Sequence, residues 1–404
     1  MTIDSKYPPS VKAGKPILGE QPHGWERSSL NNFLDLIPRK VKLEDDTEYD
    51  LLTVKRSRGG VVRREHLLGK DIKVKSQFEV KAGDFVISKR QIVHGACGLV
   101  PPDLDGSIVS NEYSVFHAKP NFDLEFFQYL SETLYFQQTC FHSSIGVHIE
   151  KMIFKLEDWY KWNFNIPPLK EQKKIAKILS TWDEVINTTE RLIDNSKQQK
   201  KALMQQLLTG KKRLLDDSGK SFDSEWRFST FSELFKVANN KKTQVKSSEY
   251  LSDGKTPIVD QGKQLISGYT NNDEKYTELP VIIFGDHTRV VKWVNFAFAQ
   301  GADGTQVLKS TKLLNDKYAF YLLSDTDIPN LGYSRHMREL KEKDFKYPTD
   351  IREQERIASV LTNADKEIEL LEKQLGDLKQ EKKALMQQLL TGKRRVKIDD
   401  KEVA

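Results

Sequence analysis

The chain has 404 residues, of which 38% are hydrophobic and 10% aromatic, and its 64 Lys and Arg against 58 Asp and Glu give a net charge of +6. This composition excludes a wholly disordered chain, and the lack of any run of 18 apolar residues excludes a helical membrane span. Two cysteines, Cys97 and Cys140, are too few for a disulfide framework or a zinc site, and the first residues lack the apolar segment of a signal peptide. We therefore expect a cytoplasmic protein without a membrane partner.

The first large segment, residues 26–163, has the pattern of a mixed α/β domain. Strands are expected over residues 50–55, 72–75, 83–88 and 108–116, and an amphipathic helix over residues 123–136. The segment is close to neutral, because most of the excess positive charge lies in residues 170–213. Any contact with nucleic acid must therefore come from local clusters rather than from a basic surface.

A long helix is predicted next, since residues 171–208 contain no Gly or Pro and carry apolar residues at alternating steps of four and three. Gly210 follows the last turn, where a glycine commonly ends a helix. Thirty-eight residues in a helix extend roughly 57 Å.

The second large segment, residues 227–344, differs from the first in sequence and length. Strands are expected over residues 281–284, 290–294 and 296–299, and a helix over residues 316–323. A second long helix then leads to Gly392, and it carries the same seam, that is, the same row of apolar residues at alternating steps of four and three.

An internal repeat connects the two helices. The sequence KKALMQQLLTGK occurs at residues 200–211 and again at 382–393, and the ungapped alignment of residues 171–211 with 353–393 has 22 identities in 41 positions. Trp25 and Trp226 align near the start of each half. The chain is therefore two copies of one plan, in which a shared helix follows a variable domain.

The two seams predict a helix pair, although each helix could instead pack on its own domain. Equivalent units paired by an isologous contact are related by a two-fold axis, which makes the helices antiparallel. The expected interface residues are Ile175, Leu179, Trp182, Ile186, Leu203 and Leu207 of the first helix, and Ile357, Leu361, Ile368, Leu375, Leu385 and Leu389 of the second.

Polar clusters occur in both variable segments. In the first they lie at residues 55–64 and 89–94, and in the second at residues 260–264, 285–292 and 333–338. Arg, Lys, Gln and His in loops suit DNA phosphates and base edges, but solvated loops have the same composition. The sequence contains no phosphate-binding P-loop, zinc-protease, serine-hydrolase or dinucleotide-binding motif and no methyltransferase tetrapeptide.

The chain closely resembles a specificity subunit of a type I restriction-modification system. The resemblance rests on Trp25 and Trp226, on the helix starts PPLKEQKKIAKILSTWDEVI and PTDIREQERIASVL, and on the repeated KKALMQQLLTGK. Inside the variable segments TPIVDQG, SGYT, IIFGDHTRVV, GADGTQVL, GDFVISKR and VSNEY resemble a common type of target-recognition domain.

The resemblance implies a DNA-binding subunit that performs no chemistry. Each of two recognition domains would read one half of a split, non-palindromic site in double-stranded DNA, and the helices would set the spacer. The helices would also dock two methyltransferase (modification) subunits, and two restriction (motor-nuclease) subunits would complete the complex. No cofactor is expected on this chain, whereas S-adenosylmethionine, ATP and magnesium are expected on the partners. Some members carry tandem four-residue repeats in the central helix that set the spacer, and this chain has none.

The expected fold is α/β (α+β), with two recognition domains joined and separated by an antiparallel coiled coil in a pseudo-two-fold repeat. The expected division is a tail at 1–20, a first domain at 21–169, a central helix at 170–210, a linker at 211–225, a second domain at 226–351, a C-terminal helix at 352–392 and a tail at 393–404. The expected DNA contacts are Arg56, Arg58, Arg63, Lys89, Arg90 and Gln91 in the first domain, and Lys263, Gln264, His287, Arg289, Arg335 and His336 in the second.

Two other classes of protein stay open at this point. One is a fused methyltransferase or nuclease with its own recognition domains, which methyl transfer by the purified chain would reveal. The other is a coiled-coil scaffold without a function on DNA, which would bind no sequence preferentially when a methyltransferase is supplied.

Overall fold

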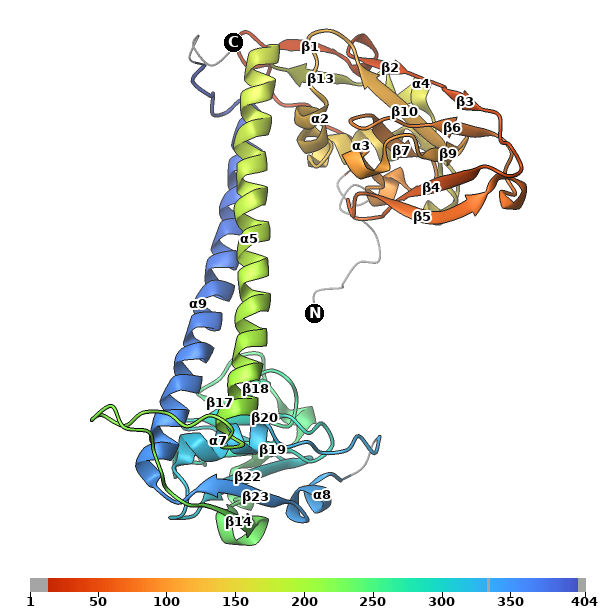
Figure 1. Cartoon of the computed structure of the whole chain (residues 1–404). Coiled ribbons are helices and arrows are strands. Elements are labelled where there is room, and N and C mark those ends of the chain that lie inside the picture. Colours follow the sequence, from red (N-terminus) through yellow and green to blue (C-terminus); the bar gives the residue numbers. More distant parts are fainter. Residues whose placement is uncertain (1–13, 333–334, 399–404) are drawn as a thin grey trace. The chain divides into compact units, whose positions relative to one another are not determined.

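A computed structural model describes residues 14–332 and 335–398 of the chain. The chain forms two compact units, one from residues up to 188 together with residues from 375 onward, and one from residues 189–374. The long helices α5 (Leu169–Leu207) and α9 (Ile351–Leu389) each contribute to both units (Figure 1). Each unit therefore contains one globular domain, the first half of the helix that follows it and the last half of the other helix.

The globular domain of the first unit is a mixed α/β structure. Its four sheets have the strand orders β1-β13, β2-β10-β7-β8, β11-β12 and β3-β6-β9-β4-β5. The strands are β1 (Glu26–Ser29), β2 (Leu34–Leu36), β3 (Lys40–Val41), β4 (Glu48–Val54), β5 (Val61–Leu68), β6 (Gln77–Glu79), β7 (Phe85–Ser88), β8 (Cys97–Leu99), β9 (Ile108–Ser110), β10 (Tyr113–Ala118), β11 (Ser144–Ile145), β12 (Ile153–Phe154) and β13 (Asn163–Ile166). The α-helices are α2 (Leu124–Leu130), α3 (Leu134–His142) and α4 (Leu156–Trp159).

The domain of the second unit has three sheets, with the orders β14-β23, β15-β22-β19-β20 and β16-β21-β17-β18. The strands are β14 (Trp226–Thr230), β15 (Phe235–Val237), β16 (Gln244–Val245), β17 (Thr256–Val259), β18 (Gly268–Thr270), β19 (Val281–Gly285), β20 (Val291–Val294), β21 (Ala299–Gly301), β22 (Thr305–Ser310) and β23 (Asp344–Pro348). The α-helices are α6 (Phe231–Leu234), α7 (Asp316–Ser324) and α8 (Met337–Lys341).

One four-stranded sheet is common to both domains. In the order β2-β10-β7-β8 and in the order β15-β22-β19-β20, every neighbouring pair is antiparallel. The central strands β7 and β19 are wholly buried, as their apolar sequences FVIS and VIIFG predict. The connections β7–β8 and β19–β20 therefore occupy equivalent places, which the sequences alone do not align.

Four of the expected elements differ from the structure. Residues 72–75 form no strand, because Ile72 closes a short 3₁₀ turn (Gly69–Asp71) and is buried in an apolar cluster. Residues 108–116 form two strands, and a turn at residues 111–112 separates them. Of residues 296–299, only Ala299 lies in a strand, and Phe298 makes an isolated bridge to Tyr276.

The predicted helix over residues 123–136 is two helices. The Ser131 hydroxyl donates to the Gln128 carbonyl, and the Thr133 hydroxyl donates to the Leu130 carbonyl. Both side chains compete with the helical backbone for these acceptors. Thr133 then caps α3, since its oxygen accepts the Phe136 N–H.

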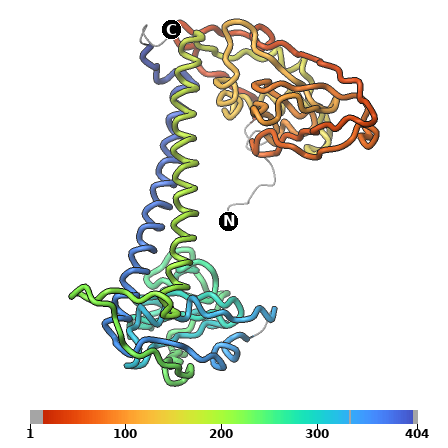
Figure 2. Tube along the Cα trace, viewed as in Figure 1, coloured from red at the N-terminus to blue at the C-terminus, as the bar shows by residue number. Residues whose placement is uncertain are grey.

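The long helices pair in antiparallel fashion, as predicted, through both ends of their seams (Figure 2). In the first unit Ile175 and Leu179 of α5 belong to the same apolar cluster as Leu385 and Leu389 of α9. In the second unit the equivalent residues do the same, namely Ile357 and Leu361 of α9 with Leu203 and Leu207 of α5. Of the other expected interface residues, Ile186 is buried, whereas Trp182, Ile368 and Leu375 are only partly buried.

The helices end three residues earlier than the predicted boundaries at 210 and 392, and a short turn that contains a glycine follows each. Gly210 and Gly392 have φ values of +74° and +69°, which glycine adopts without strain. A Cβ on Gly210 would lie 3.1 Å from the Trp226 ring, and one on Gly392 would lie 2.3 Å from Pro22. No helix in the described part of the chain is long and apolar enough to cross a membrane.

Candidate nucleic-acid interface

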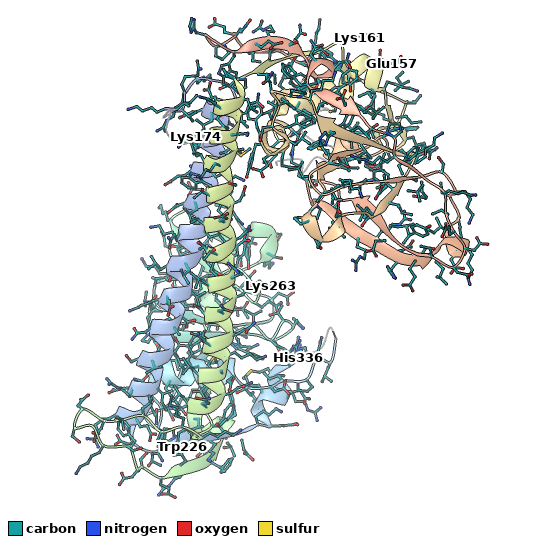
Figure 3. The ribbon with its side chains drawn as sticks, turned by 45° about the horizontal axis from the view of Figure 1, so that its top comes forward. Glu157, Lys161, Lys174, Trp226, Lys263 and His336 are labelled. Atoms are coloured by element: carbon teal, nitrogen blue, oxygen red, sulfur yellow. The ribbon has the colours of Figure 1, made fainter. Side chains whose placement is uncertain are left out.

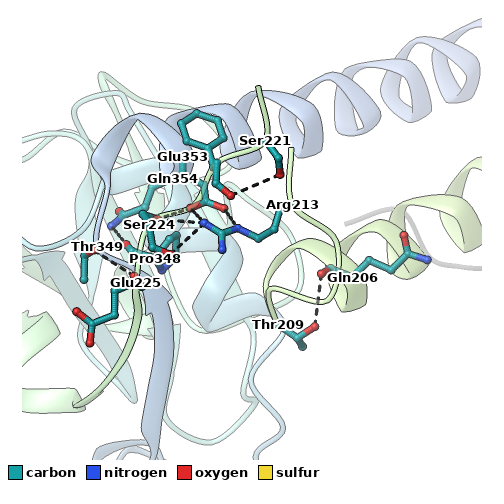
Figure 4. A network of polar contacts seen from close by, with 11 residues as sticks. Gln206, Thr209, Arg213, Ser221, Ser224, Glu225, Pro348, Thr349, Glu353 and Gln354 are labelled. Carbon is teal, nitrogen blue, oxygen red and sulfur yellow. Dashed lines mark hydrogen bonds and ion pairs between the residues drawn. The ribbon is translucent and has the colours of Figure 1, made fainter. Parts of the chain in front are cut away.

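Each domain is fixed to its helices by a pair of equivalent polar clusters. The first is a clasp in which the buried Glu353 accepts from Nε and Nη2 of Arg213 at 2.6 and 2.7 Å and from the Ser224 hydroxyl at 2.6 Å (Figure 4). The Arg213 guanidinium also lies 5.9 Å from the centre of the Trp226 ring. The predicted linker thus closes the second domain against the start of α9.

The same clasp occurs in the first unit, where Glu171 accepts from Nε and Nη2 of Arg395, both at 2.7 Å. The Trp25 indole adds a third hydrogen bond to this carboxylate at 3.1 Å. Arg213 and Arg395 are 182 residues apart, as are Glu171 and Glu353, so the clasps follow the internal repeat. Arg395, in the segment expected as a tail after 392, is therefore part of the first unit.

The second pair of clusters joins a tyrosine, an aspartate and a lysine. Tyr129 of α2 donates to Asp183 at 2.8 Å, and Lys382 of α9 donates to the same carboxylate at 2.5 Å. In the second unit Tyr321 of α7 donates to Asp365 at 2.7 Å, and Lys200 also pairs with Asp365. Burial raises the pKa of both tyrosine hydroxyls, so each keeps the proton that it donates. These contacts anchor α2 and α7 to the long helices.

In the second domain a buried aspartate organises two of the polar loops. Asp286, only 4% exposed, follows β19, and its Oδ1 accepts the Met337 N–H at 2.7 Å. Its carbonyl accepts the His336 N–H at 2.8 Å and lies 2.9 Å from His336 Nδ1. The segment that leads into α8 is therefore held against the β19–β20 connection.

A buried lysine organises the loop at residues 260–264. Lys292 of β20 donates to the carbonyls of Asp260, at 2.7 Å, and Gln264. Its side chain is 5% exposed, and this burial lowers the pKa of the ammonium group. The loop is fixed from its other side by Gln261, whose Oε1 accepts the His287 N–H at 3.0 Å and whose carbonyl accepts the Thr288 hydroxyl at 2.6 Å.

The expected DNA-contacting residues of the second domain fall into two groups. Lys263, Gln264 and Arg335 are exposed, on loops that buried hydrogen bonds hold. Arg289 has a φ of +62° and donates from Nη1 to the Ile328 carbonyl at 2.8 Å, so its guanidinium is already engaged beyond α7. His287 is half-buried.

His336 requires a correction, because it is wholly buried and hydrogen-bonded to the β19–β20 connection. Figure 3 labels it just before α8, and Lys263 in the loop after β17. The Leu331 N–H donates to its Nε2 at 3.3 Å, which leaves neither ring nitrogen for a base. His336 supports the loop that carries Arg335, and the expectation that it reads DNA is wrong for this structure. Tyr333 and Ser334, of the same cluster, lie outside the described residues.

In the first domain the β4–β5 turn rests on the β7–β8 connection. Ser57 and Arg58 have φ values of +55° and +57°, and their N–H groups donate to the carbonyls of His94 and Gly95. Arg58 also donates from Nη2 to the Ser131 carbonyl at 3.0 Å, at the end of α2. Arg58 and Arg289 thus have similar roles in this structure, since Arg58 joins its turn to the end of α2 and Arg289 joins its turn to the segment after α7.

The other basic residues expected to contact DNA in this domain have partners at the surface. Lys89 is half-buried, which lowers its pKa, and it donates to the Asn111 carbonyl at 2.7 Å. The Gln91 side-chain oxygen is buried and has no hydrogen-bond partner within the described ranges. Three arginines form ion pairs with carboxylates: Arg56 with Glu150 at 2.5 Å, Arg63 with Asp50 at 2.9 Å, and Arg90 with Glu112 at 2.6 Å.

Sequence reasoning missed the residues that hold these loops. Asp286 and Lys292 stood inside a recognised polar cluster, but nothing in the pattern marks them as buried. Glu112 and Glu150 lie 22 and 94 residues from their arginines, and only the fold brings them together. Among residues 14–332 and 335–398, no three His, Cys, Asp or Glu side chains gather closely enough to hold a metal ion.

Comparison with known proteins gives consistent matches over most of the chain. The family model "Type I restriction modification DNA specificity domain" matches residues 22–196 and again 223–380. A putative type I restriction enzyme MjaX specificity subunit of Methanocaldococcus jannaschii is 30% identical over 57% of this chain, which spans 59% of that relative. The MjaVIII specificity subunit of the same organism is 25% identical over 93% of this chain and 94% of the relative.

Solved structures show the same fold. An HsdS subunit from Thermoanaerobacter tengcongensis aligns with 93% of this chain and 99% of its own, at a TM-score of 0.50 and 18% identity. An S subunit from M. genitalium aligns with 93% and 98%, at a TM-score of 0.57 and 16% identity. With two matched copies of its domain, two equivalent recognition folds and a paired helical scaffold, the chain belongs to the family of type I restriction-modification specificity subunits, the non-catalytic members of those complexes.

Proposed function

We propose that this chain selects the DNA sequence on which a type I restriction-modification complex acts, and that each domain reads one half of a bipartite site. One observation carries the proposal: equivalent sheets on a repeated scaffold present different polar loops at the same places, residues 89–96 in one domain and 286–290 in the other. Different loops select different bases, so the two half-sites differ and the site is non-palindromic.

The chemistry of the loops supports reading of base edges in double-stranded DNA. Arg, Lys and Gln donate to guanine and adenine in the major groove, and each domain carries such groups on loops that buried hydrogen bonds fix. A fixed loop loses little conformational entropy on binding, which favours specificity. The net charge of the whole chain is only +6, so its own non-specific binding to DNA would be weak. Much of the non-specific affinity of the complex would therefore come from the partner subunits.

The repeated helices provide the second part of the proposal. A pseudo-two-fold protein suits half-sites about one helical turn, or 34–36 Å, apart, and a 39-residue helix is roughly 58 Å long. The helices would set the spacer and dock two methyltransferase subunits, and two restriction subunits would join the complex. S-adenosylmethionine, ATP and magnesium belong to those partners in this proposal.

Mapping of methylated bases across the genome tests the proposal in cells that carry this chain and its methyltransferase. A split motif with two unlike halves is expected. Exchanging residues 26–163 for the same segment of a relative should change one half of that motif only. Methylation without a split motif, or a change in both halves, would contradict the assignment of one half-site to each domain.

A further inference from the structure

Two arginines of the first domain pair with carboxylates through different edges of the guanidinium group. Arg90 donates to Glu112 from Nε at 2.6 Å and from Nη2 at 3.3 Å, which are the nitrogens of the side edge. Arg56 donates to Glu150 from Nη2 at 2.5 Å and from Nη1 at 3.5 Å, which are the nitrogens of the end edge. A guanidinium group has five N–H donors in a fixed plane, so the edge that is used decides which donors are left.

The Arg90 pairing leaves the end of the guanidinium group open. Nη1 keeps both of its N–H groups, and Nη2 keeps one beside them, so two parallel donors point away from Glu112. This pair of donors matches the O6 and N7 acceptors of guanine in the major groove. Arg56 keeps only the pair on its side edge, Nε–H and one N–H of Nη2, because Glu150 occupies the end edge.

The backbone around Arg90 and Glu112 is held in place. The two residues lie just beyond the paired ends of β7 and β10, where Ser88 is opposite Tyr113. The Lys89 N–H donates to the Glu112 carbonyl at 2.9 Å, and the Lys89 carbonyl accepts the Phe154 N–H at 2.8 Å. The two side chains nevertheless stay accessible, with 52% of Arg90 and 45% of Glu112 exposed.

We propose that Glu112 is a positioning residue that presets the end edge of Arg90 to read a guanine, and that Glu150 withholds the same edge of Arg56. The proposal rests on the proposed function, because it assumes that this edge of the first domain faces DNA. An isolated surface ion pair contributes little to stability, so the value of the Arg90–Glu112 pair lies in orientation. Orientation reduces the number of side-chain conformations that DNA binding must freeze.

The test uses the full chain with its methyltransferase and a panel of duplexes in which each base pair of the mapped site is replaced singly. Arg90→Ala should lose discrimination at one G·C pair by roughly 5- to 150-fold, the value of one bidentate contact. Glu112→Ala keeps the arginine and should lose several-fold at that same pair only. Glu112→Asp should restore part of the loss, and Glu112→Ala added to Arg90→Ala should cost nothing further.

Glu150→Ala is the matched control, because it frees an arginine of the same domain. Glu150→Ala should tighten binding to all sequences without changing the discrimination between base pairs. The slope of log affinity against log salt concentration should steepen by about one released counterion. The proposal is overturned if Glu112→Ala weakens all duplexes alike, or if it leaves discrimination within twofold at every position. Failure of the proposed function gives a different result, since the parent complex itself would then bind all duplexes equally.

Discussion

The two recognition domains have the same sheet and the same anchors on the helices, but they display their basic side chains differently. In the second domain the buried Lys292 and Asp286 hold the loops from inside, and Lys263 and Arg335 stay exposed. In the first domain Arg56, Arg63 and Arg90 lie at the surface, and each has a carboxylate partner. The comparison teaches that one frame can present its surface cations exposed or paired with carboxylates.

The largest effect is expected where the two units are most alike. Leu179 and Leu361 are equivalent positions of α5 and α9, and both are 0% exposed. Each change to Ala should lower the free energy of unfolding of its own unit by about 2–5 kcal/mol, because it removes buried methyl groups and leaves a cavity. Denaturant unfolding of both variants measures this, with Leu370→Ala, at an exposed position of α9, as the control. Losses that differ more than twofold would mean that the two halves of the scaffold are not equivalent.

The clasps should give the next largest effect. Glu353→Ala removes a buried carboxylate and leaves Arg213 and Ser224 without their partner. A broken buried pair costs about 3–5 kcal/mol, and the partial exposure of Arg213 reduces this to about 2–4 kcal/mol. Glu171→Ala should have a smaller effect, because Arg395 is more exposed than Arg213. Thermal unfolding of the two variants measures both losses of stability. A larger loss for Glu171→Ala than for Glu353→Ala would show that the Trp25 hydrogen bond dominates the first clasp.

Removing the buried ammonium group of Lys292 tests how the second domain fixes its loop. Lys292→Met leaves the Asp260 and Gln264 carbonyls without a donor, which should cost about 1–3 kcal/mol of stability at pH 7. Because burial lowers the pKa of Lys292, the unfolded chain binds this proton more tightly than the folded chain. The parent should therefore gain stability relative to the variant as the pH rises from the lowered pKa towards about 10.5. A stability difference that stays constant over this range would contradict the pKa direction.

The smallest effect concerns free and paired cations on the two domains. Lys263→Ala should weaken DNA binding by the complex by roughly fivefold, or about 1 kcal/mol, because this exposed ammonium group has no partner among the described residues to compete with DNA. Arg56→Ala should weaken binding by less than twofold, since Glu150 already occupies its terminal nitrogens. Titration at two salt concentrations measures both, and equal losses would remove the contrast between the domains.

The sequence predicts what depends on periodicity and leaves open what depends on distant contacts. The helix seams and the apolar strands β7 and β19 follow from spacing and composition, and the repeat reveals the two equivalent domains. The break at Ser131–Thr133 arises from side-chain hydrogen bonds that an apolar pattern does not show. The burial of His336 depends on Asp286, 50 residues earlier, and the carboxylates of Arg56 and Arg90 are equally remote.

The first unit joins residues up to 188 with residues from 375 onward, and this division has a consequence for the order of synthesis on the ribosome. The second unit is a continuous segment that can fold as soon as it has emerged. The first domain waits for the last turns of α9 and for Arg395, which contacts the His23 carbonyl 372 positions earlier. At about 5–20 residues per second, the 186 residues from 189 to 374 take roughly 10–40 s to make. During that interval the start of α5 exposes the apolar seam that α9 later covers, so the domain made first is completed last.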